Sequence, residues 1–382
     1  MSSELNTKTL FSAHFLCWRI LGMLPPKNSY RPLYLLYSLV INLAVTVGYP
    51  LHLIWGLFTS TTMYEVIQNM AITLTCTVCA MKTLAIWWRF NKVFVMFEII
   101  RRQDERLTLP HDIRYMRREV YPHVRRIILL FSILCSFIGA SGELSVLVAG
   151  LLGDWKLMYQ AYFPFDVYAK TRNYIVAHIY QFVGISYMIL QNVVNDTFGA
   201  AHLALLGGHV RMLCMRVSNI GHDVTKTKKE NNRELLECIQ DHKDLMEYRR
   251  QLEEVVSVYM FFQILVAGAN MCVSLVFIIL FVDDIFTLAY YMSYFVSMVF
   301  EILPSCYYGT LLEDEFQNLA YALFSCNWPD QSVEFRKNLR IVAEQASRRM
   351  FVTAWLFRIN NNAFIIACKN SYTLFALVMN LK

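Results

Sequence analysis

The sequence predicts an all-α polytopic membrane protein with seven transmembrane helices, its amino terminus cytosolic and its carboxyl terminus extracellular. Three observations carry this prediction: an apolar composition, seven apolar runs of membrane-spanning length, and an alternating distribution of basic residues. Of the 382 residues, 56% are hydrophobic and 17% are charged, whereas about 25% of residues are charged in a typical soluble domain. The composition therefore argues against an ordinary soluble protein.

The apolar runs are separated by polar turns or by charged segments. A helix of about 20 residues crosses the hydrocarbon core of a bilayer, and each run reaches this length. We expect spans at residues 33–58, 66–90, 127–152, 173–217, 255–282, 285–312 and 360–382. The fourth run is too long for the bilayer alone, so one end of that helix should protrude.

Lys and Arg residues gather in alternate connections. Of the 35, 29 lie in the N-terminal segment or in the connections between spans 2 and 3, 4 and 5, and 6 and 7; four lie on the opposite side, and Lys82 and Lys369 lie within spans. Cytosolic loops are enriched in Lys and Arg, so this distribution places the amino terminus in the cytosol. The topology is the inverse of that of a G-protein-coupled receptor. No acidic-Arg-Tyr tripeptide closes the third span, and the seventh contains no Asn-Pro-x-x-Tyr.

The segments outside the spans have helical patterns of their own. Residues 1–32 form an amphipathic N-terminal segment, which we expect to lie on the cytosolic membrane surface through Phe11, Phe15, Trp18 and Leu21. The charged segments 218–254 and 313–358 each carry an apolar stripe that needs a partner to cover it.

Several functional classes are disfavoured. The net charge of +6 is spread over separate loops, which is not typical of a nucleic-acid-binding face. Cys76 and Cys79 form a CxxC inside an apolar run, where packing is a better interpretation than redox chemistry. No phosphate-binding loop, zinc-protease motif or nucleophile elbow is present. The charged stretch 241–244 has no second ligand cluster nearby in sequence. We expect no catalytic residue, metal or cofactor.

The last fifth of the chain resembles the insect odorant receptor family. The resemblance is specific over residues 307–382, whereas upstream it rests on topology, loop order and length. Gustatory receptors carry a Thr-Tyr followed by a Gln-Phe pair in the last span, and this chain lacks such a pair, which favours the odorant branch. The matching residues are Tyr307, Tyr308, Glu313, Tyr321, Trp328, Pro329, Arg336, Lys337, Arg348, Arg349, Phe364, Lys369, Ser371, Tyr372, Leu374 and Phe375.

The resemblance implies a four-subunit, ligand-gated, nonselective cation channel in the plasma membrane of a sensory-neuron dendrite, with the seventh helices lining one pore. The family's co-receptor has a long insertion between helices 4 and 5. That connection is short here, which implies an odour-tuning subunit. The implied partners are the co-receptor subunit, a small volatile odorant, membrane lipid and permeating cations. A gustatory-type receptor channel remains the alternative, followed by an inverted seven-helix membrane enzyme or transporter.

By its residues alone, the last span fits a lipid anchor, a packed core helix or a pore wall. Leu377 and Leu381 lie four apart on one helix face, with Asn380 beside them. The resemblance places the family's constriction on these three residues, where a ring of leucines would close the pore by dewetting. Leucines that simply face lipid are the alternative.

The resemblance also places a ligand site in the outer half of the bundle, among spans 2, 3, 4 and 6. A small apolar ligand requires an aromatic and aliphatic cavity with a few polar groups. We favour Tyr291 and Tyr294 most, because tyrosines three apart supply ring faces and a hydroxyl. Ordinary packing is the alternative for each candidate, and His178 fits a hydrogen-bonded packing residue better than a proton sensor. The candidates are Met70, Thr73, Thr77, Ser141, Glu143, Val146, Tyr174, His178, Phe182, Ile185, Tyr291, Tyr294, Phe295 and Met298.

Ionisable residues at membrane depth are functional candidates by default. Lys82 and Glu301 lie at similar depth in the inner half, where they could pair, but we expect Lys82 to extend toward the interface instead. Lys369 lies below the predicted gate, where the wide vestibule implied by the family would hydrate it. The turn 283–284 holds two aspartates that could concentrate cations or simply be solvated. The sequon at 195–197 should be unmodified, because it lies toward the cytosolic end of its span.

Overall fold

The computed structural model describes residues 5–26, 30–151, 153, 155, 157–159, 161–282 and 285–380, apart from the side chains of Ser145 and Phe286. The aspartates at 283–284 and the predicted gate residue Leu381 therefore lie outside the described residues. Seven helices are long and apolar enough to cross a membrane, so the chain is a multi-pass membrane protein. They span Arg31–Thr59, Met63–Trp88, Pro110–Leu151, Thr171–Ser218, Lys228–Phe281, Thr287–Ser325 and Asn361–Asn380.

The first half of the chain contains the N-terminal segment and three spans. A 3-10 turn, Thr7–Phe11, leads into α1, and the first span joins α2 and α3 through a π-helical turn, Asn42–Val47. The third span joins α6 and α7 through a second π-helical turn, Met116–Val120. The bounds are α1 Ser12–Ile20, α2 Arg31–Ile41, α3 Gly48–Thr59, α4 Met63–Trp88, α5 Phe90–Arg106, α6 Pro110–Tyr115 and α7 Tyr121–Leu151.

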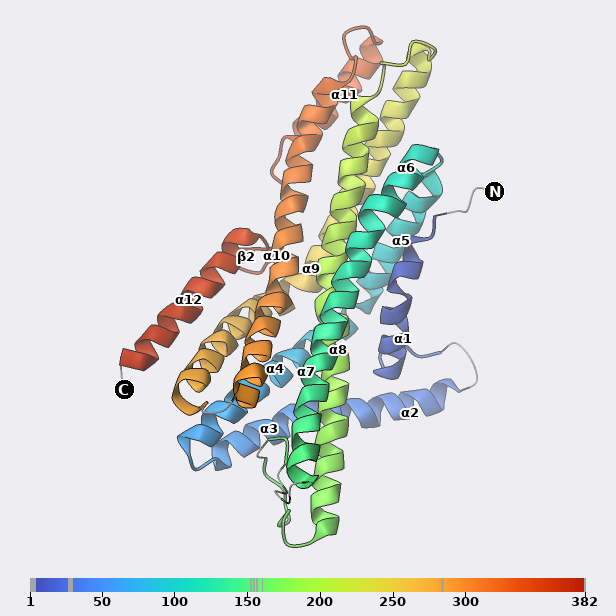
Figure 1. Cartoon of the computed structure of the whole chain (residues 1–382). Coiled ribbons are helices and arrows are strands. Elements are labelled where there is room, and N and C mark those ends of the chain that lie inside the picture. Colours follow the sequence, from blue (N-terminus) through green and yellow to red (C-terminus); the bar gives the residue numbers. More distant parts are fainter. Residues whose placement is uncertain are drawn as a thin grey trace.

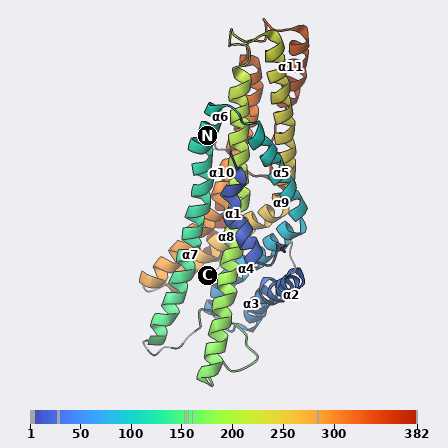
Figure 2. The ribbon, with the colours of Figure 1, turned by 90° about the vertical axis from the view of Figure 1, so that its right-hand side faces the viewer.

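The second half is built on three long helices, α8 (Thr171–Ser218), α9 (Lys228–Phe281) and α10 (Ile285–Ser325). Figures 1 and 2 show them side by side along the length of the molecule, extending at one end to the shorter α11 (Val333–Ala346). A two-residue antiparallel hairpin, β1 (Thr353–Ala354) and β2 (Phe357–Arg358), precedes α12 (Asn361–Asn380). In the described part of the chain, this hairpin is the one departure from an all-helical fold.

Three spans continue further than predicted. The helical pattern of the third begins at Pro110 rather than 127, α9 begins at Lys228 rather than 255, and α10 ends at Ser325 rather than 312. The charged segment before 255 keeps an apolar stripe whose buried residues include Leu235, Cys238, Leu245, Tyr248 and Leu252. This stripe packs against neighbouring helices, so the helix continues beyond the apolar run. Thr227 and Glu230 begin it with reciprocal capping hydrogen bonds.

The N-terminal segment packs against the protein, not on the membrane surface as we predicted. The ring of Phe11 stacks on that of His202 in α8, with 4.4 Å between centroids. The Trp18 ring meets Phe90 of α5 edge-on at 4.9 Å, and both Phe11 and Trp18 are fully buried. Aromatic partners on α5 and α8 thus cover the apolar face that the sequence pattern assigned to lipid.

Three sequence motifs are packing features. Cys76 and Cys79 are buried free thiols, as we expected. The asparagine of the sequon, Asn195, is fully buried and its amide donates to Thr83 Oγ1 at 2.8 Å, so it is inaccessible within α8. The charged stretch at 241–244 takes part in packing: Asp241 is buried and pairs with Arg216 at 2.5 Å.

Candidate ligand pocket and pore helix

An aromatic cluster joins α4, α9 and α10 at one predicted ligand-binding position. Tyr291 of α10 is 7% exposed, and its ring stacks on Phe277 of α9 with 4.0 Å between centroids. Ile67 and Ala71 of α4 belong to the same buried cluster, and Met70 packs against it. This cluster brings together Met70 and Tyr291, two of the predicted ligand-binding residues from different spans.

A polar bridge lies next to this cluster. The Tyr294 hydroxyl shares a hydrogen bond of 2.8 Å with Thr75 Oγ1 and donates to the Ala71 carbonyl at 3.2 Å. The Asn270 amide of α9 donates to the same Thr75 hydroxyl at 2.8 Å. One threonine thus joins α4, α9 and α10 through buried or half-buried polar groups.

Sequence reasoning missed Thr75, Asn270 and Phe277. We predicted Thr73 and Thr77 instead, but these hydroxyls donate to carbonyls of their own helix, at Asn69 and Thr73. A signal for Asn270 was available, because a side-chain amide inside the apolar run of the fifth span needs a partner. No comparable signal distinguished Thr75 from its neighbours.

A second group of predicted residues joins α7 and α8. Glu143 Oε1 lies 2.9 Å from His178 Nε2. The Tyr174 ring is nearly parallel to the His178 ring at a centroid distance of 5.8 Å. Glu143 Oε2 and His178 Nδ1 are buried atoms with no hydrogen-bond partner in the described structure. His178 is therefore paired with Glu143, and the pair keeps one free polar atom on each side chain.

The remaining candidates are dispersed. Val146 is buried, and the Ser141 hydroxyl donates to the Ile138 carbonyl of its own helix at 2.9 Å. Phe182 is 47% exposed and so lies on the outer surface of the chain, apart from the other candidates. The three others pack into or against the central hydrophobic core: Ile185, Phe295 and Met298.

The candidate pore helix α12 is mostly uncovered by the rest of the described chain. Its buried residues are Ala363, Ala367 and Ser371, all small and on one stripe. Leu377 is 55% exposed, and Asn380 is also exposed. Figure 1 shows α12 at the side of the bundle. An apolar groove of about 170 Å³ runs beside the contact between α9 and α12, and its lining includes Ile264, Gly268, Ile366 and Leu374.

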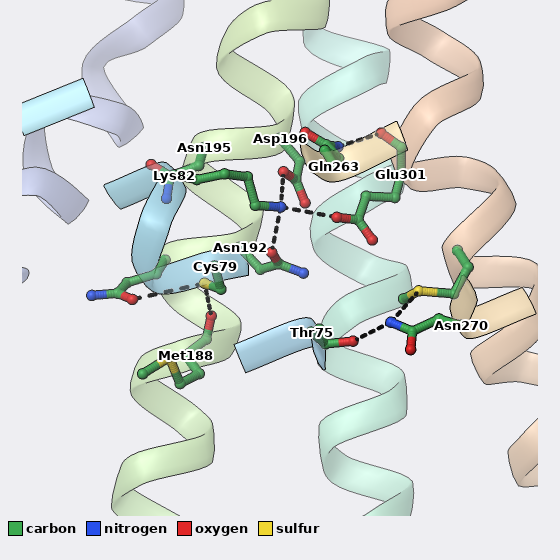
Figure 3. A network of polar contacts seen from close by, with 12 residues as sticks. Thr75, Cys79, Lys82, Met188, Asn192, Asn195, Asp196, Gln263, Asn270 and Glu301 are labelled. Carbon is green, nitrogen blue, oxygen red and sulfur yellow. Dashed lines mark hydrogen bonds and ion pairs between the residues drawn. The ribbon is translucent and has the colours of Figure 1, made fainter. Parts of the chain in front are cut away.

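The buried charges on α4, α8 and α10 contradict our expectation that Lys82 extends toward the interface. Lys82 is 1% exposed, and its Nζ lies 2.5 Å from Asp196 Oδ1 and 2.9 Å from Glu301 Oε1. Figure 3 shows both carboxyl groups converging on the lysine nitrogen, with Asn192 on a further side. Asp196 belongs to the sequon that we considered only as a modification site, so the sequence analysis missed the nearer partner.

Comparisons with known proteins agree with this architecture. A family model described as 7tm Odorant receptor matches residues 62–372. The chain is 34% identical to Odorant receptor 59a of Drosophila melanogaster over 99% of both chains. It is 30% identical to Odorant receptor 33b of the same species, over 99% of this chain and 98% of the relative. Its fold is similar to that of the insect olfactory receptor OR5 from Machilis hrabei in complex with eugenol, with a TM-score of 0.84, 15% identity and 99% of both chains covered.

Proposed function

Because the chain belongs to the 7tm odorant receptor family, we propose that it is the tuning subunit of a heteromeric, ligand-gated, nonselective cation channel in the plasma membrane. Its amino terminus is cytosolic and its carboxyl terminus extracellular. As a member of this family, the chain is a receptor rather than an enzyme. Its proposed partners are the odorant co-receptor subunit, a small volatile hydrophobic ligand, lipid and permeating cations.

The exposure of α12 is the observation that supports the channel proposal most directly. Among its 20 residues, the buried ones are Ala363, Ala367 and Ser371, while Leu374, Leu377 and Tyr372 are 47%, 55% and 67% exposed. A span that also carries Asn370 and Asn380 requires polar surroundings along part of its surface. Neighbouring subunits and a water-filled pore would supply those surroundings, with Leu377, Asn380 and Leu381 near the constriction.

Two residue groups in the outer half of the bundle support the ligand proposal. The cluster around Tyr291 and Tyr294 offers aromatic surface, and the Glu143–His178 pair offers one unpaired acceptor oxygen and one unpaired ring nitrogen. Such a combination suits a small apolar molecule with one polar group. We propose that the apolar body contacts the tyrosines and that the polar group meets Glu143 or His178.

Whole-cell recording tests the channel proposal. Cells that express this chain together with the co-receptor should give odorant-evoked nonselective cation current. Cells that express this chain without the co-receptor should give no such current. Current from this chain alone would instead support a gustatory-type channel. The absence of gated current in every combination, with both subunits detected at the cell surface, would overturn the proposal.

An epitope tag tests the proposed orientation. A tag placed after Lys382 should be accessible to antibody on intact cells, whereas a tag before Met1 should become accessible only after permeabilisation. The reverse pattern would contradict the orientation without affecting the family assignment.

A further inference from the structure

The buried lysine of α4 has the hydrogen bonds of a charged ammonium group. Lys82 Nζ donates to Asp196 Oδ1 at 2.5 Å, to Glu301 Oε1 at 2.9 Å and to Asn192 Oδ1 at 2.9 Å. An ammonium group has three N–H donors, so each donor has one acceptor. This arrangement matches protonated Lys82, because all three N–H groups of the ammonium are used.

The charges around this lysine do not balance. Asp196 and Glu301 would together carry two negative charges if both were ionised, and Lys82 carries one positive charge. Among the described residues, no second Lys or Arg pairs with either carboxyl group. The side chains of Lys82, Asp196 and Glu301 are 1%, 2% and 7% exposed. An uncompensated buried charge is costly, so a group in this position tends to take up a proton.

The other titratable groups that face the site cannot supply the missing positive charge. They are Cys79 of α4, Cys135 of α7, Tyr259 of α9 and Tyr294 of α10. Thiols and phenols are neutral when protonated and negative when ionised. The amide of Gln263 on α9 donates to the Glu301 backbone carbonyl at 2.9 Å and contributes no charge.

The two carboxyl groups are also close to each other. Asp196 Oδ1 and Glu301 Oε1 both contact the same nitrogen, Lys82 Nζ, at 2.5 Å and 2.9 Å, and Asp196 Oδ2 is a buried oxygen with no donor in the described structure. Two ionised carboxylates would repel each other at this separation. One added proton would change that repulsion into an O–H···O hydrogen bond.

We propose that Asp196 and Glu301 form a buried proton-binding site. One proton, taken from water, is bonded to an oxygen of one carboxyl group and hydrogen-bonded to the other group, so that the three side chains together are neutral. A proton fits the site better than a metal ion, because Lys82 already occupies the point on which both carboxyl groups converge. The proton thereby connects α8 to α10 beside the lysine that connects both helices to α4.

Infrared spectroscopy of the full-length chain in lipid nanodiscs tests this site. At about pH 8, where exposed carboxyl groups are ionised, the wild-type protein should keep one protonated-carboxyl band that shifts on exchange into D₂O. Asp196→Asn leaves one carboxylate beside Lys82, and so does Glu301→Gln. Both variants should lose the band, because the proton belongs to the pair and not to either residue alone. Glu254→Gln, which removes a half-exposed carboxyl group paired with Lys92, should keep it.

Three outcomes would overturn the proposal. The first is a wild-type protein without a protonated-carboxyl band, a measurement that does not depend on whether the variants fold. The second is loss of the band in one of the two neutralising variants but not in the other. The third is a melting temperature that rises with sodium or potassium concentration in the wild type only, which would assign the site to an alkali cation.

Discussion

Gly309 of α10 lies directly against the main chain of Ile359, the residue that leads into α12. A Cβ atom placed on Gly309 would overlap the Ile359 carbonyl oxygen, and Asn361 N–H donates to the nearby Thr310 hydroxyl at 2.9 Å. This contact is between backbones, so no side-chain rotation can relieve a clash. It positions the start of the proposed pore helix against α10.

We therefore expect Gly309→Ala to lower the free energy of unfolding by about 1–3 kcal/mol and to reduce odorant-evoked current. Gly207→Ala in α8 is the matched control, because its Cβ would lie 3.9 Å from the nearest atom, Leu312 Cα. Both changes increase helix propensity equally, so the difference between them isolates the contact. Thermal unfolding in detergent and whole-cell recording provide the two measurements. Equal behaviour of the two variants would contradict this role for Gly309.

The hydroxyl bridge between Tyr294 and Thr75 should be measurable as a coupling between α10 and α4. Tyr294→Phe and Thr75→Val should each cost about 0.5–1.5 kcal/mol of stability. The double variant should cost less than the sum, since both changes remove the same hydrogen bond. Denaturant unfolding of the four proteins gives the cycle. Additive effects would show that the hydrogen bond contributes nothing to stability.

Alanine variants of two tyrosines of α10 address the ligand site. If Tyr291 and Tyr294 contact the odorant, Tyr291→Ala and Tyr294→Ala should each shift the dose-response curve to higher concentration, by tenfold or more for about 1.4 kcal/mol of lost binding energy. Tyr321→Ala is a suitable control, because this tyrosine of α10 is 76% exposed and far along the helix from both. An unchanged curve for both variants, at normal surface expression, would remove these tyrosines from the site.

Loss of the buried lysine should be far more damaging than loss of an exposed arginine in an ion pair. Lys82→Ala leaves two buried carboxyl groups without their cation, and we expect a loss of about 3–5 kcal/mol. Arg101→Ala removes a surface residue paired with Glu98 and Glu105, and we expect no measurable change. Thermal unfolding and the yield of folded protein compare the two. Similar stability of both variants would mean that Lys82 is not essential to the packing of α4, α8 and α10.

Docking of the N-terminal segment should depend on pH through Asp104 of α5. Its carboxyl group accepts hydrogen bonds from the Thr7 N–H at 2.8 Å and the Thr7 hydroxyl at 2.6 Å. Burial nevertheless raises the pKa of Asp104 from 3.8 to about 6. The folded protein thus binds a proton that the unfolded chain releases, so stability falls as pH rises from about 4 to about 6 and is level above.

The melting temperature measured across this pH range should show the decline in the wild type. Asp104→Asn cannot titrate, so the melting temperature of the wild type relative to that of the variant should fall as pH rises through this window and stay constant above about pH 7. A constant difference in melting temperature at every pH would show that the pKa of Asp104 is the same in the folded and the unfolded protein.

Substitution of a polar residue for Leu377 tests the proposed gate. Leu377→Ser should increase current in the absence of odorant, because a polar ring no longer dewets the constriction. Leu147→Ser in α7 is the control, since Leu147 is 53% exposed, close to the 55% of Leu377, but lies on a different helix. Whole-cell recording of both variants with the co-receptor gives the comparison. Equal resting current in the two would place the gate elsewhere.

The number and approximate position of the spans followed from the sequence, because a bilayer imposes a minimum apolar length that composition alone reveals. Boundaries were less accurate where helices leave the apolar region. Leu245 and Leu252 of α9 continue the apolar stripe among charged residues, but the stripe alone does not show that this segment and the fifth span form one unbroken helix. The resemblance in residues 307–382 identified the family, which the comparisons confirm.

The sequence by itself therefore determined a seven-span membrane receptor and the span to which each buried ionisable residue belongs. Only the tertiary structure decided which of them meet. Lys82 and Asp196 are 114 positions apart, and depth says nothing about rotation of a helix about its axis or about which helix stands opposite. Helix rotation and the identity of the opposing helix decide whether Lys82 extends to the interface or is buried beside two carboxyl groups. They are set by packing of whole helices, of which the contact between Gly309 and Ile359 is one example.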